Sequence, residues 1–261
     1  MTVDETMLSP EDIARFGSDP SGLFRANLAS VEERIARACA RAGRERDSVR
    51  LLPITKTVPA HILRHAHAVG ITSFGENKIQ EAMTKREALN DLAIDWNIVG
   101  HLQTNKVKYL TRFAREFHAL DSLKLAGLLN TRLDREDRFL DVYVQVNTSG
   151  EESKFGLHPD ALLPFVDMLT RFPRLRPRGL MTLALFSSDM ARVRPCFVRL
   201  RRLRDQAVRL HPGLSGLSMG MTGDFEEAIE EGATVVRVGQ AIFGKRPTSD
   251  DFYWPGAGGK P

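Results

Sequence analysis

Residues 214–244 read LSGLSMGMTGDFEEAIEEGATVVRVGQAIFG, and they contain one complete strand–helix–strand unit. β-rich runs lie at 214–219 and 234–238, and a helical pattern over 223–231 connects them. Two strands joined by a helix are typical of a parallel pair, because a parallel connection must cross back over the sheet. This unit predicts an α/β fold with a parallel sheet.

The same alternation extends from this unit back to about residue 50. Eight helical patterns are present when the one over 21–41 is included. Eight such units in about 250 residues predict a single-domain (β/α)8 barrel of the TIM type. An open doubly wound sheet is the alternative, but it usually has fewer strands, and no GxGxxG motif follows the first strand. The expected strands are 50–55, 71–75, 95–99, 116–120, 140–147, 175–184, 214–219 and 234–238, and the other helices are 59–69, 77–90, 103–114, 122–136, 159–171, 189–210 and 223–231.

Three segments are predicted along the chain. Residues 1–20 are expected to form a flexible leader, residues 21–246 the barrel, and residues 247–261 an irregular Gly/Pro-rich tail. The leader is acidic and lacks the apolar core of a secretory signal. No run reaches the roughly 18 apolar residues that a membrane span needs. The two cysteines, Cys39 and Cys196, lack metal or CxxC spacing, so we expect no metal site and a reducing, cytoplasmic environment.

The net charge of +4 raises the question of a nucleic-acid partner. Much of the positive charge lies in residues 189–210, where apolar residues recur every three or four positions. That spacing is typical of an amphipathic helix with a solvated arginine face. With no aromatic platform or RNP-type motif, the sequence does not favour nucleic-acid binding.

The chemistry of a (β/α)8 barrel gathers where its strands end. Strand 7 ends in a stretch that contains Ser218, Gly220 and Thr222, and strand 8 carries Arg237 and ends in Gly239 and Gln240. Hydroxyls, glycines and backbone N–H groups at these two strands are typical of a phosphate site. The alternatives are an ordinary helix cap after strand 7 and an ion pair between Arg237 and a glutamate.

Strand 1 ends on a lysine, Lys56, in the sequence ITKTVP. Strand 1 adjoins strand 8 once the barrel closes, so Lys56 would lie beside the phosphate site. A lysine in an enclosed site can lose its proton and form a Schiff base. The combination indicates pyridoxal 5′-phosphate (PLP) or an aldolase that acts on a phosphorylated sugar.

Seven ordered motifs resemble the YggS/PROSC family of PLP homeostasis proteins, which is related to the N-terminal barrel of alanine racemase. The motifs are ITKTVP, FGENKIQEA, NIVGHLQTNK, VNTSGEESKFG, RGLMT, LSMGMTGDFEEAIEEGAT and VVRVGQAIFG. The resemblance implies PLP as a Schiff base on Lys56, a phosphate held near Ser218, Gly239 and Gln240, Arg237 at the pyridine nitrogen, and Asn77 near the cofactor.

This sequence departs from the family pattern in places. Gln240 occupies a position where threonine is common, which leaves one side-chain phosphate contact open. LALFSSD, residues 183–189, replaces the more typical loop, which leaves open any ligand that faces PLP, and the leader is longer than usual.

The function predicted from these residues is PLP binding in intracellular vitamin B6 and amino-acid homeostasis, with little catalysis. Arginine can only donate to the ring nitrogen, so it disfavours carbanion chemistry. Alanine racemase takes its second base, a tyrosine, from a C-terminal domain that we expect to be absent here. Tyr109, Tyr143 and Tyr253 are not persuasive substitutes, and His101 and His118 are weaker candidates than structural histidines.

The alternative to the carrier is a weak amino-acid racemase with Lys56 as its catalytic residue and a second base from the loop LFSSDM, residues 185–190. A Schiff-base aldolase is a third hypothesis. The expected partners are PLP and PLP-dependent apoenzymes. The expected oligomeric state is a monomer.

Overall fold

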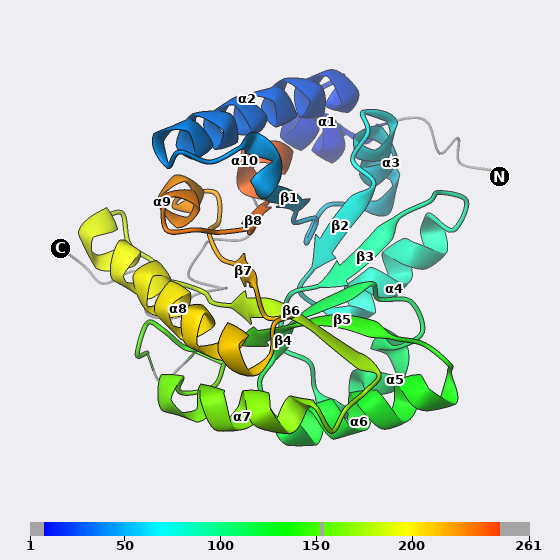
Figure 1. Ribbon diagram of the computed structural model, residues 1–261. Helices are drawn as coiled ribbons and strands as arrows, with labels where there is room; N and C mark the ends of the chain where they lie inside the picture. Colours follow the sequence, from blue (N-terminus) through cyan, green and yellow to red (C-terminus); the bar gives the residue numbers. More distant parts are fainter. Residues whose placement is uncertain (1–7, 152–153, 246–261) are drawn as a thin grey trace.

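The computed structural model describes residues 8–151 and 154–245. Within these ranges, eight parallel strands form one sheet in the order β1-β8-β7-β6-β5-β4-β3-β2, with helices around the outside (Figure 1). A bridge from Ile54 to Gly75 connects the end of β1 to β2, and Thr55 N–H donates to the Gly75 carbonyl at 2.9 Å. The sheet therefore curls into a nearly closed barrel, and the (β/α)8 prediction is confirmed.

The strands are short and mostly buried, as expected for a sheet covered by helices. They are β1 (Arg50–Pro53), β2 (Ser73–Glu76), β3 (Asp95–Ile98), β4 (Glu116–Leu120), β5 (Leu140–Gln145), β6 (Leu175–Met181), β7 (Gly216–Ser218) and β8 (Val235–Val238).

The outer helices are close to the predicted ones, except that the helix expected over 103–114 is a 3-10 turn followed by one α-helical turn. They are α1 (Pro10–Phe16), α2 (Pro20–Arg41), α3 (Ala60–Ala68), α4 (Ile79–Ala88), α5 (Val107–Leu110), α6 (Leu123–Arg135), α7 (Leu162–Leu169), α8 (Met190–Leu210), α9 (Phe225–Glu230) and α10 (Gln240–Phe243), with 3-10 turns at Arg46–Ser48, Thr104–Lys106 and Pro159–Ala161.

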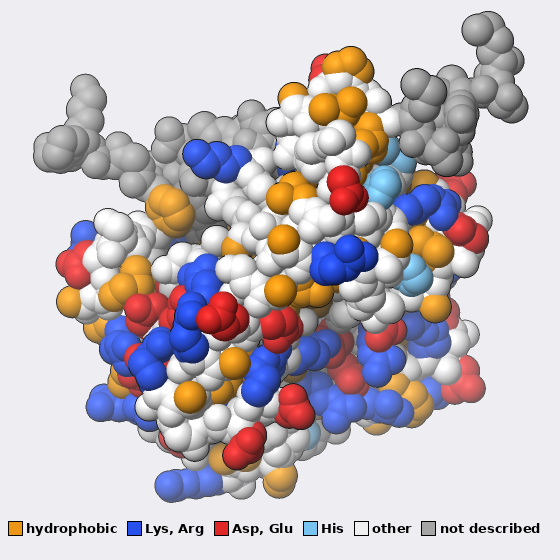
Figure 2. Space-filling model, turned by 90° about the horizontal axis from the view of Figure 1, so that it is seen from above, with side chains coloured by type: hydrophobic (Ala, Val, Ile, Leu, Met, Phe, Trp, Pro, Cys, Tyr) orange, Lys and Arg blue, Asp and Glu red, His pale blue; other side chains and the backbone are white. Residues whose placement is uncertain are grey.

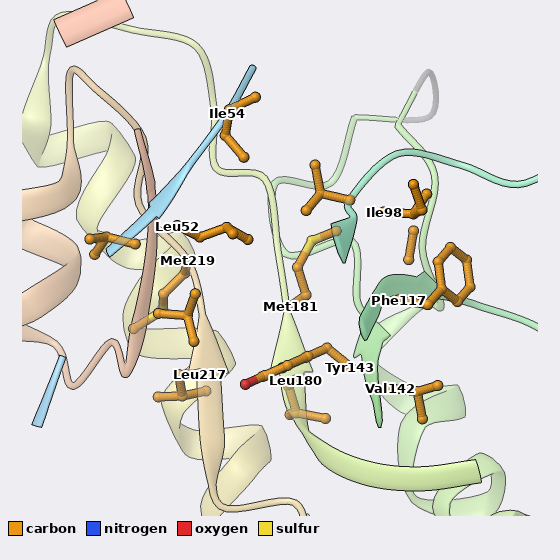
Figure 3. Close-up of a cluster of buried hydrophobic side chains, with 14 of the residues drawn as sticks. Leu52, Ile54, Ile98, Phe117, Val142, Tyr143, Leu180, Met181, Leu217 and Met219 are labelled. Carbon is orange, nitrogen blue, oxygen red and sulfur yellow. The ribbon is translucent and has the colours of Figure 1, made fainter. Parts of the chain in front are cut away.

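Apolar side chains fill the barrel wall and the layer beneath the helices. Figure 3 shows one such cluster, in which side chains from most of the strands converge. Leu52, Phe117, Val142, Leu180 and Leu217 in this cluster are fully buried. Burial of apolar surface stabilises the folded state by roughly 25 cal/mol per Å². The packed strands therefore provide fixed supports for the residues at their ends.

The prediction of a flexible leader over 1–20 is wrong for residues 10–16, which form helix α1. Ser9 and Asp12 make a reciprocal capping box at its start, with Pro10 in the first turn. Phe16 is 1% exposed and packs edge-on against Phe24 of α2. The Ser–Pro–Glu–Asp sequence is a helix-start signal, so the sequence did contain this information. Residues 1–7 and the predicted tail, 247–261, lie outside the described residues.

Helix α8 is amphipathic, as its spacing predicts. Val193, Phe197 and Leu200 are buried, whereas Leu210, in the last turn, is 52% exposed. Arg194 bridges to Glu230 and Glu231 of the α9 segment. Figure 2 likewise shows basic and acidic side chains interspersed on the face it presents. In the part of the chain that the structure describes, no helix has the length and apolar character needed to cross a membrane.

Candidate functional site

A cavity of about 510 Å³ opens at the carboxyl ends of the strands. Six of the eight predicted site residues line it: Lys56, Asn77, Thr222, Arg237, Gly239 and Gln240. They come from the ends of β1, β2, β7 and β8. Asn77 is held close by Gly100, where a Cβ atom would lie only 2.3 Å from the Asn77 carbonyl oxygen. The barrel thus brings together residues that are up to 184 positions apart (240 − 56).

The backbone turn after Lys56 is strained and is held by charged side chains. Thr57 has φ of +66°, a region that β-branched residues rarely adopt. Its N–H donates to Glu81 Oε1 of α4 at 2.6 Å, and its carbonyl accepts from Arg15 Nη1 of α1 at 2.7 Å. Arg15 Nη2 also donates to Thr57 Oγ1 at 3.2 Å. The two helices therefore fix the turn that carries Lys56.

Residue 55, on the other side of Lys56, is tied to a buried ion cluster. Lys85 of α4 is 5% exposed and donates to the Thr55 carbonyl at 2.8 Å, to Glu76 Oε1 at 2.7 Å and to Glu81 Oε1 at 2.6 Å. Thr55 Oγ1 donates to Glu76 Oε1 at 2.6 Å. The backbone before and after Lys56 is thus bound to the same cluster.

Glu76 is the most perturbed member of this cluster. Burial raises its pKa to about 7, and the nearby Lys85 charge offsets only part of that effect. Its second carboxylate oxygen, Oε2, is buried without a hydrogen-bond partner among the described residues. A carboxyl group with one unsatisfied buried oxygen is expected to take up a proton near neutral pH.

Arg237 is held from beneath the cavity. Its guanidinium donates from Nη1 to Ser218 Oγ and from Nη2 to the Thr182 carbonyl, both at 2.8 Å. Burial lowers its pKa to about 10, partly offset by the charge of Asp224, so it stays protonated at neutral pH. Among the described residues, Arg237 makes no ion pair with a glutamate, so that alternative is wrong.

A hydrogen-bonded chain continues from Ser218 into the barrel. His118 Nδ1 lies 2.9 Å from Ser218 Oγ, and His118 Nε2 lies 2.8 Å from Glu116 Oε2. Glu116 also pairs with Arg50 at the opposite end of the barrel. If Glu116 accepts from Nε2–H, then Ser218 donates to Nδ1 and accepts from Arg237, and every proton in the chain has a partner.

Burial and the neighbouring groups together set the protonation states of the side chains in this hydrogen-bonded series. Burial lowers the pKa of His118 against the opposing effect of Glu116, which favours the neutral imidazole. Burial by itself would raise the pKa of Glu116, but the hydrogen bond from His118 and the charge of Arg50 outweigh it and lower the pKa to about 2. The chain therefore connects an ionised carboxylate to Arg237 through two neutral side chains.

The loops after β7 and β8 meet at the other side of the cavity. Ala241 N–H donates to Thr222 Oγ1 at 3.4 Å, which joins the loop after β7 to the start of α10. Asp224 also lines the cavity, but its carboxylate accepts from Met221 N–H at 2.5 Å, and burial raises its pKa. Thr222, Gly239 and Gln240 are left as the groups suited to an anion.

The mouth of the cavity is flanked by aromatic side chains. His101 and Phe155 stack with ring centroids 3.9 Å apart, and Phe155 is 56% exposed. Lys154 Nζ donates to the Ala184 carbonyl at 2.8 Å, which joins the loops after β5 and β6. Phe186, in the loop that departs from the family pattern, also lines the cavity.

Two predicted site residues do not line the cavity. Ser218 is fully buried, with its hydroxyl engaged by His118 and Arg237, so it supports Arg237 from below. Gly220 has φ of +92°, and a Cβ there would lie 2.7 Å from Ala228 Cβ. Its role in this structure is a tight turn that packs against α9.

Tyr143 is buried against His118, and Tyr109 lies on α5. Neither tyrosine lines the cavity, and Tyr253 lies outside the described residues.

The sequence interpretation missed the support residues Arg15, Glu81 and Lys85. Glu81 and Lys85 have the i, i+4 spacing of a helical ion pair, which is a signal that could have suggested them.

Comparisons with known proteins agree with the fold. The family model for the alanine racemase N-terminal domain matches residues 26–247. The chain is 43% identical over 220 residues to the pyridoxal phosphate homeostasis protein of Aquifex aeolicus, covering 84% of this chain and 96% of that protein. It is 42% identical over 220 residues to the protein of the same name from Pseudomonas aeruginosa, covering 84% and 94%.

Solved structures give the same result. A protein from Bifidobacterium adolescentis superposes with a TM-score of 0.80 at 32% identity, covering 91% of this chain and 98% of that one. PipY of Synechococcus elongatus, solved with PLP bound, superposes with a TM-score of 0.74 at 31% identity, covering 85% and 100%. With its barrel, its ordered motifs and these relatives, the chain belongs to the alanine racemase N-terminal domain family and, within it, to the family of the pyridoxal phosphate homeostasis proteins.

Proposed function

We propose that this chain binds PLP as a Schiff base on Lys56 and acts in intracellular PLP and amino-acid homeostasis. The observation that carries the proposal is the placement of Lys56 and Arg237 in one cavity, at the ends of the adjacent strands β1 and β8. The relatives named for PLP homeostasis and the PLP bound to PipY support it. A cytoplasmic monomer that delivers PLP to apoenzymes is part of the same proposal.

The residues of the cavity fit the chemical groups of PLP. The amine of Lys56 would bond to the aldehyde carbon. Thr222 and the backbone N–H groups near Gly239 and Gln240 would hold the phosphate, and Asn77 would lie beside the ring. Arg237 would donate to the pyridine nitrogen. Ser218 would act through Arg237, which revises its predicted role as a phosphate contact.

Arg237 is the residue that favours a carrier over an enzyme. PLP, when bound, supplies a conjugated ring that withdraws electrons most strongly with its nitrogen protonated. A guanidinium can only donate, and Arg237 keeps its proton at neutral pH. Because Ser218 and Thr182 hold it in one orientation, we expect the ring nitrogen to stay unprotonated.

A racemase is the second candidate, and one observation favours it. His101 lines the cavity, and its Nδ1 lies 3.6 Å from Asp121 Oδ2, an arrangement that could orient a general base. Proton exchange at Cα of amino acids in D2O, followed by NMR, distinguishes the two. The carrier predicts slow exchange that His101→Gln leaves unchanged, whereas fast exchange abolished by His101→Gln would establish the racemase.

Borohydride reduction tests the covalent bond directly. After incubation with PLP and reduction, peptide mass spectrometry should find the pyridoxyl group on Lys56. Lys56→Ala should lose the label and the visible absorbance band, while Lys124→Ala, at an exposed position on α6, should retain both. A label that persists on the barrel of Lys56→Ala, at a stoichiometry near that of the wild type, would refute the assignment.

A further inference from the structure

Helix α1 lies before the part of the chain that the family model matches, yet it reaches the cavity. The match begins at residue 26, whereas α1 spans Pro10–Phe16. Arg15, in its last turn, is one of the residues that line the cavity. A segment outside the family match therefore contributes a side chain to the site.

Besides the hydrogen bonds of Arg15, two contacts hold α1 against the neighbouring helices α2 and α3. Phe16 is buried and packs edge-on against Phe24, with ring centroids 6.0 Å apart. Asp12 Oδ2 lies 2.9 Å from Nε2 of His61, a residue of α3. Because α1 is fixed at these two points, the side chain of Arg15 is presented to the turn at Thr57.

Arg15 binds this turn at two atoms. Nη1 donates to the Thr57 carbonyl at 2.7 Å, and Nη2 donates to Thr57 Oγ1 at 3.2 Å. Glu81 accepts from the N–H of the same residue at 2.6 Å. Both backbone groups of Thr57 are thus bound by charged side chains from different helices, at a φ value that costs free energy to maintain.

We propose that Arg15 is a positioning residue for Lys56: by clamping the strained turn at Thr57, it fixes the direction in which the Lys56 side chain enters the cavity. The inference rests on the proposed function, because it assigns Lys56 as the residue that PLP modifies. The clamp explains how a β-branched residue stays in the left-handed region directly after Lys56. The planar guanidinium suits the pair of acceptors on Thr57, whereas the ammonium group of lysine, on a flexible stem, would hold them in a less fixed geometry.

The test compares Arg15→Ala, Arg15→Lys and the control Arg25→Ala, at an exposed position on α2. Amide hydrogen exchange at Thr57, measured by NMR before PLP is added, reports the turn itself. We expect exchange to become about tenfold or more faster in Arg15→Ala, because charge-assisted hydrogen bonds are lost. Arg15→Lys should recover part of the protection, and Arg25→Ala should match the wild type.

Binding of PLP and of pyridoxal, followed by absorbance, supplies the second measurement. Because the clamp acts on the lysine and not on the phosphate, both ligands should bind about tenfold more weakly to Arg15→Ala. A loss confined to PLP would overturn the positioning role and indicate that Arg15 binds the phosphate. Unchanged exchange at Thr57, or faster exchange spread evenly over the barrel, would also overturn it.

The outcome is distinguishable from failure of the proposed function. If the wild type forms no bond between PLP and Lys56, the proposed function fails, whatever the exchange rates are. If the wild type binds PLP normally and Arg15→Ala changes neither the Thr57 amide nor the affinity, only the positioning role fails.

Discussion

The two residues at the centre of the candidate site, Arg237 and Lys56, are supported in opposite ways. Arg237 rests on a chain of side chains inside the barrel, which passes through Ser218 and His118 to Glu116. Lys56 lies on a turn held by charged side chains from α1 and α4, outside the strands. The first support is part of the core, and the second connects the barrel wall to its outer helices.

We therefore expect substitutions in the two supports to have different effects, one on the stability of the domain and the other on the geometry of one loop. A change in the buried chain leaves polar groups unsatisfied where water does not reach, so it should destabilise the whole domain. A change around the turn should alter the order and pH response of one loop with a smaller effect on unfolding. The predictions below test that division.

The largest effect is expected for Glu116→Ala. The substitution leaves the buried His118 Nε2–H without an acceptor, at a cost of about 1–3 kcal/mol, and loss of the ion pair with the partly exposed Arg50 adds about 1 kcal/mol. Urea unfolding followed by circular dichroism measures this loss. A decrease below about 1 kcal/mol would show that the buried chain does not support the core.

Glu116→Gln is the matched control, because it keeps the shape and one acceptor. The pKa of Glu116 is lowered to about 2 in the folded chain, below its ordinary value of 4.5. The unfolded state therefore binds more protons between these values, and wild-type stability should fall as the pH drops through this interval. Glu116→Gln should lack this component, so its stability should depend less steeply on acid pH.

Ser218→Ala should have the next largest effect. Its hydroxyl connects Arg237 Nη1 to His118 Nδ1, and its loss leaves both buried atoms without that partner, at a cost of about 1–3 kcal/mol. PLP affinity should weaken as well, since Arg237 loses one of its two fixed contacts. Ser215→Ala, just before β7, is the control. Weaker PLP binding with full stability would mean that Ser218 contacts the ligand directly.

The strand count and strand-end residues could be predicted from the sequence because both depend on local pattern. Short β-rich runs alternate with helical spacing, and parallel strands place their carboxyl ends at one rim. Lys56, Asn77, Thr222, Arg237, Gly239 and Gln240 are therefore found in one cavity. Ser218 could not be placed correctly, because the inward or outward direction of a residue at the end of a three-residue strand depends on its exact register.

The long-range contacts that support the site could not be predicted for a different reason. His118 and Ser218 are 100 positions apart, and Arg15 and Thr57 are 42 apart. Such pairs are set by barrel closure and by the docking of α1, and no local periodicity encodes them. A buried lysine such as Lys85 also runs against composition rules, which place lysine at the surface.

Glu76→Gln tests the Lys85 cluster beside Lys56 through the pH dependence of stability. The folded pKa of Glu76 is raised to about 7, so the folded state binds more protons than the unfolded state between about 4.5 and 7. Stability of the wild type should therefore decrease as pH rises through that interval. Glu76→Gln should remove this component when urea unfolding is measured from pH 5 to 8. An unchanged pH dependence would place the proton elsewhere in the Lys85 cluster.

The smallest effect on stability is expected for Thr57→Gly, because two contributions oppose each other. Glycine relieves the left-handed conformation at φ of +66°, which costs a non-glycine residue roughly 1–2 kcal/mol. It also removes the Oγ1 contact with Arg15 and gives the unfolded chain more freedom, which costs about 1 kcal/mol. Unfolding free energy should therefore change by less than about 1 kcal/mol.

Thr57→Ala is the informative partner of that variant, since it keeps the strain and loses the same Oγ1 contact. It should be less stable than Thr57→Gly by roughly 1 kcal/mol in urea unfolding. Both should retain the contacts that Arg15 Nη1 and Glu81 make with the backbone of residue 57. If Thr57→Ala is as stable as Thr57→Gly, the turn relaxes out of the left-handed region without its hydroxyl. The side chain, and not the pair of backbone contacts, would then hold Lys56 in place.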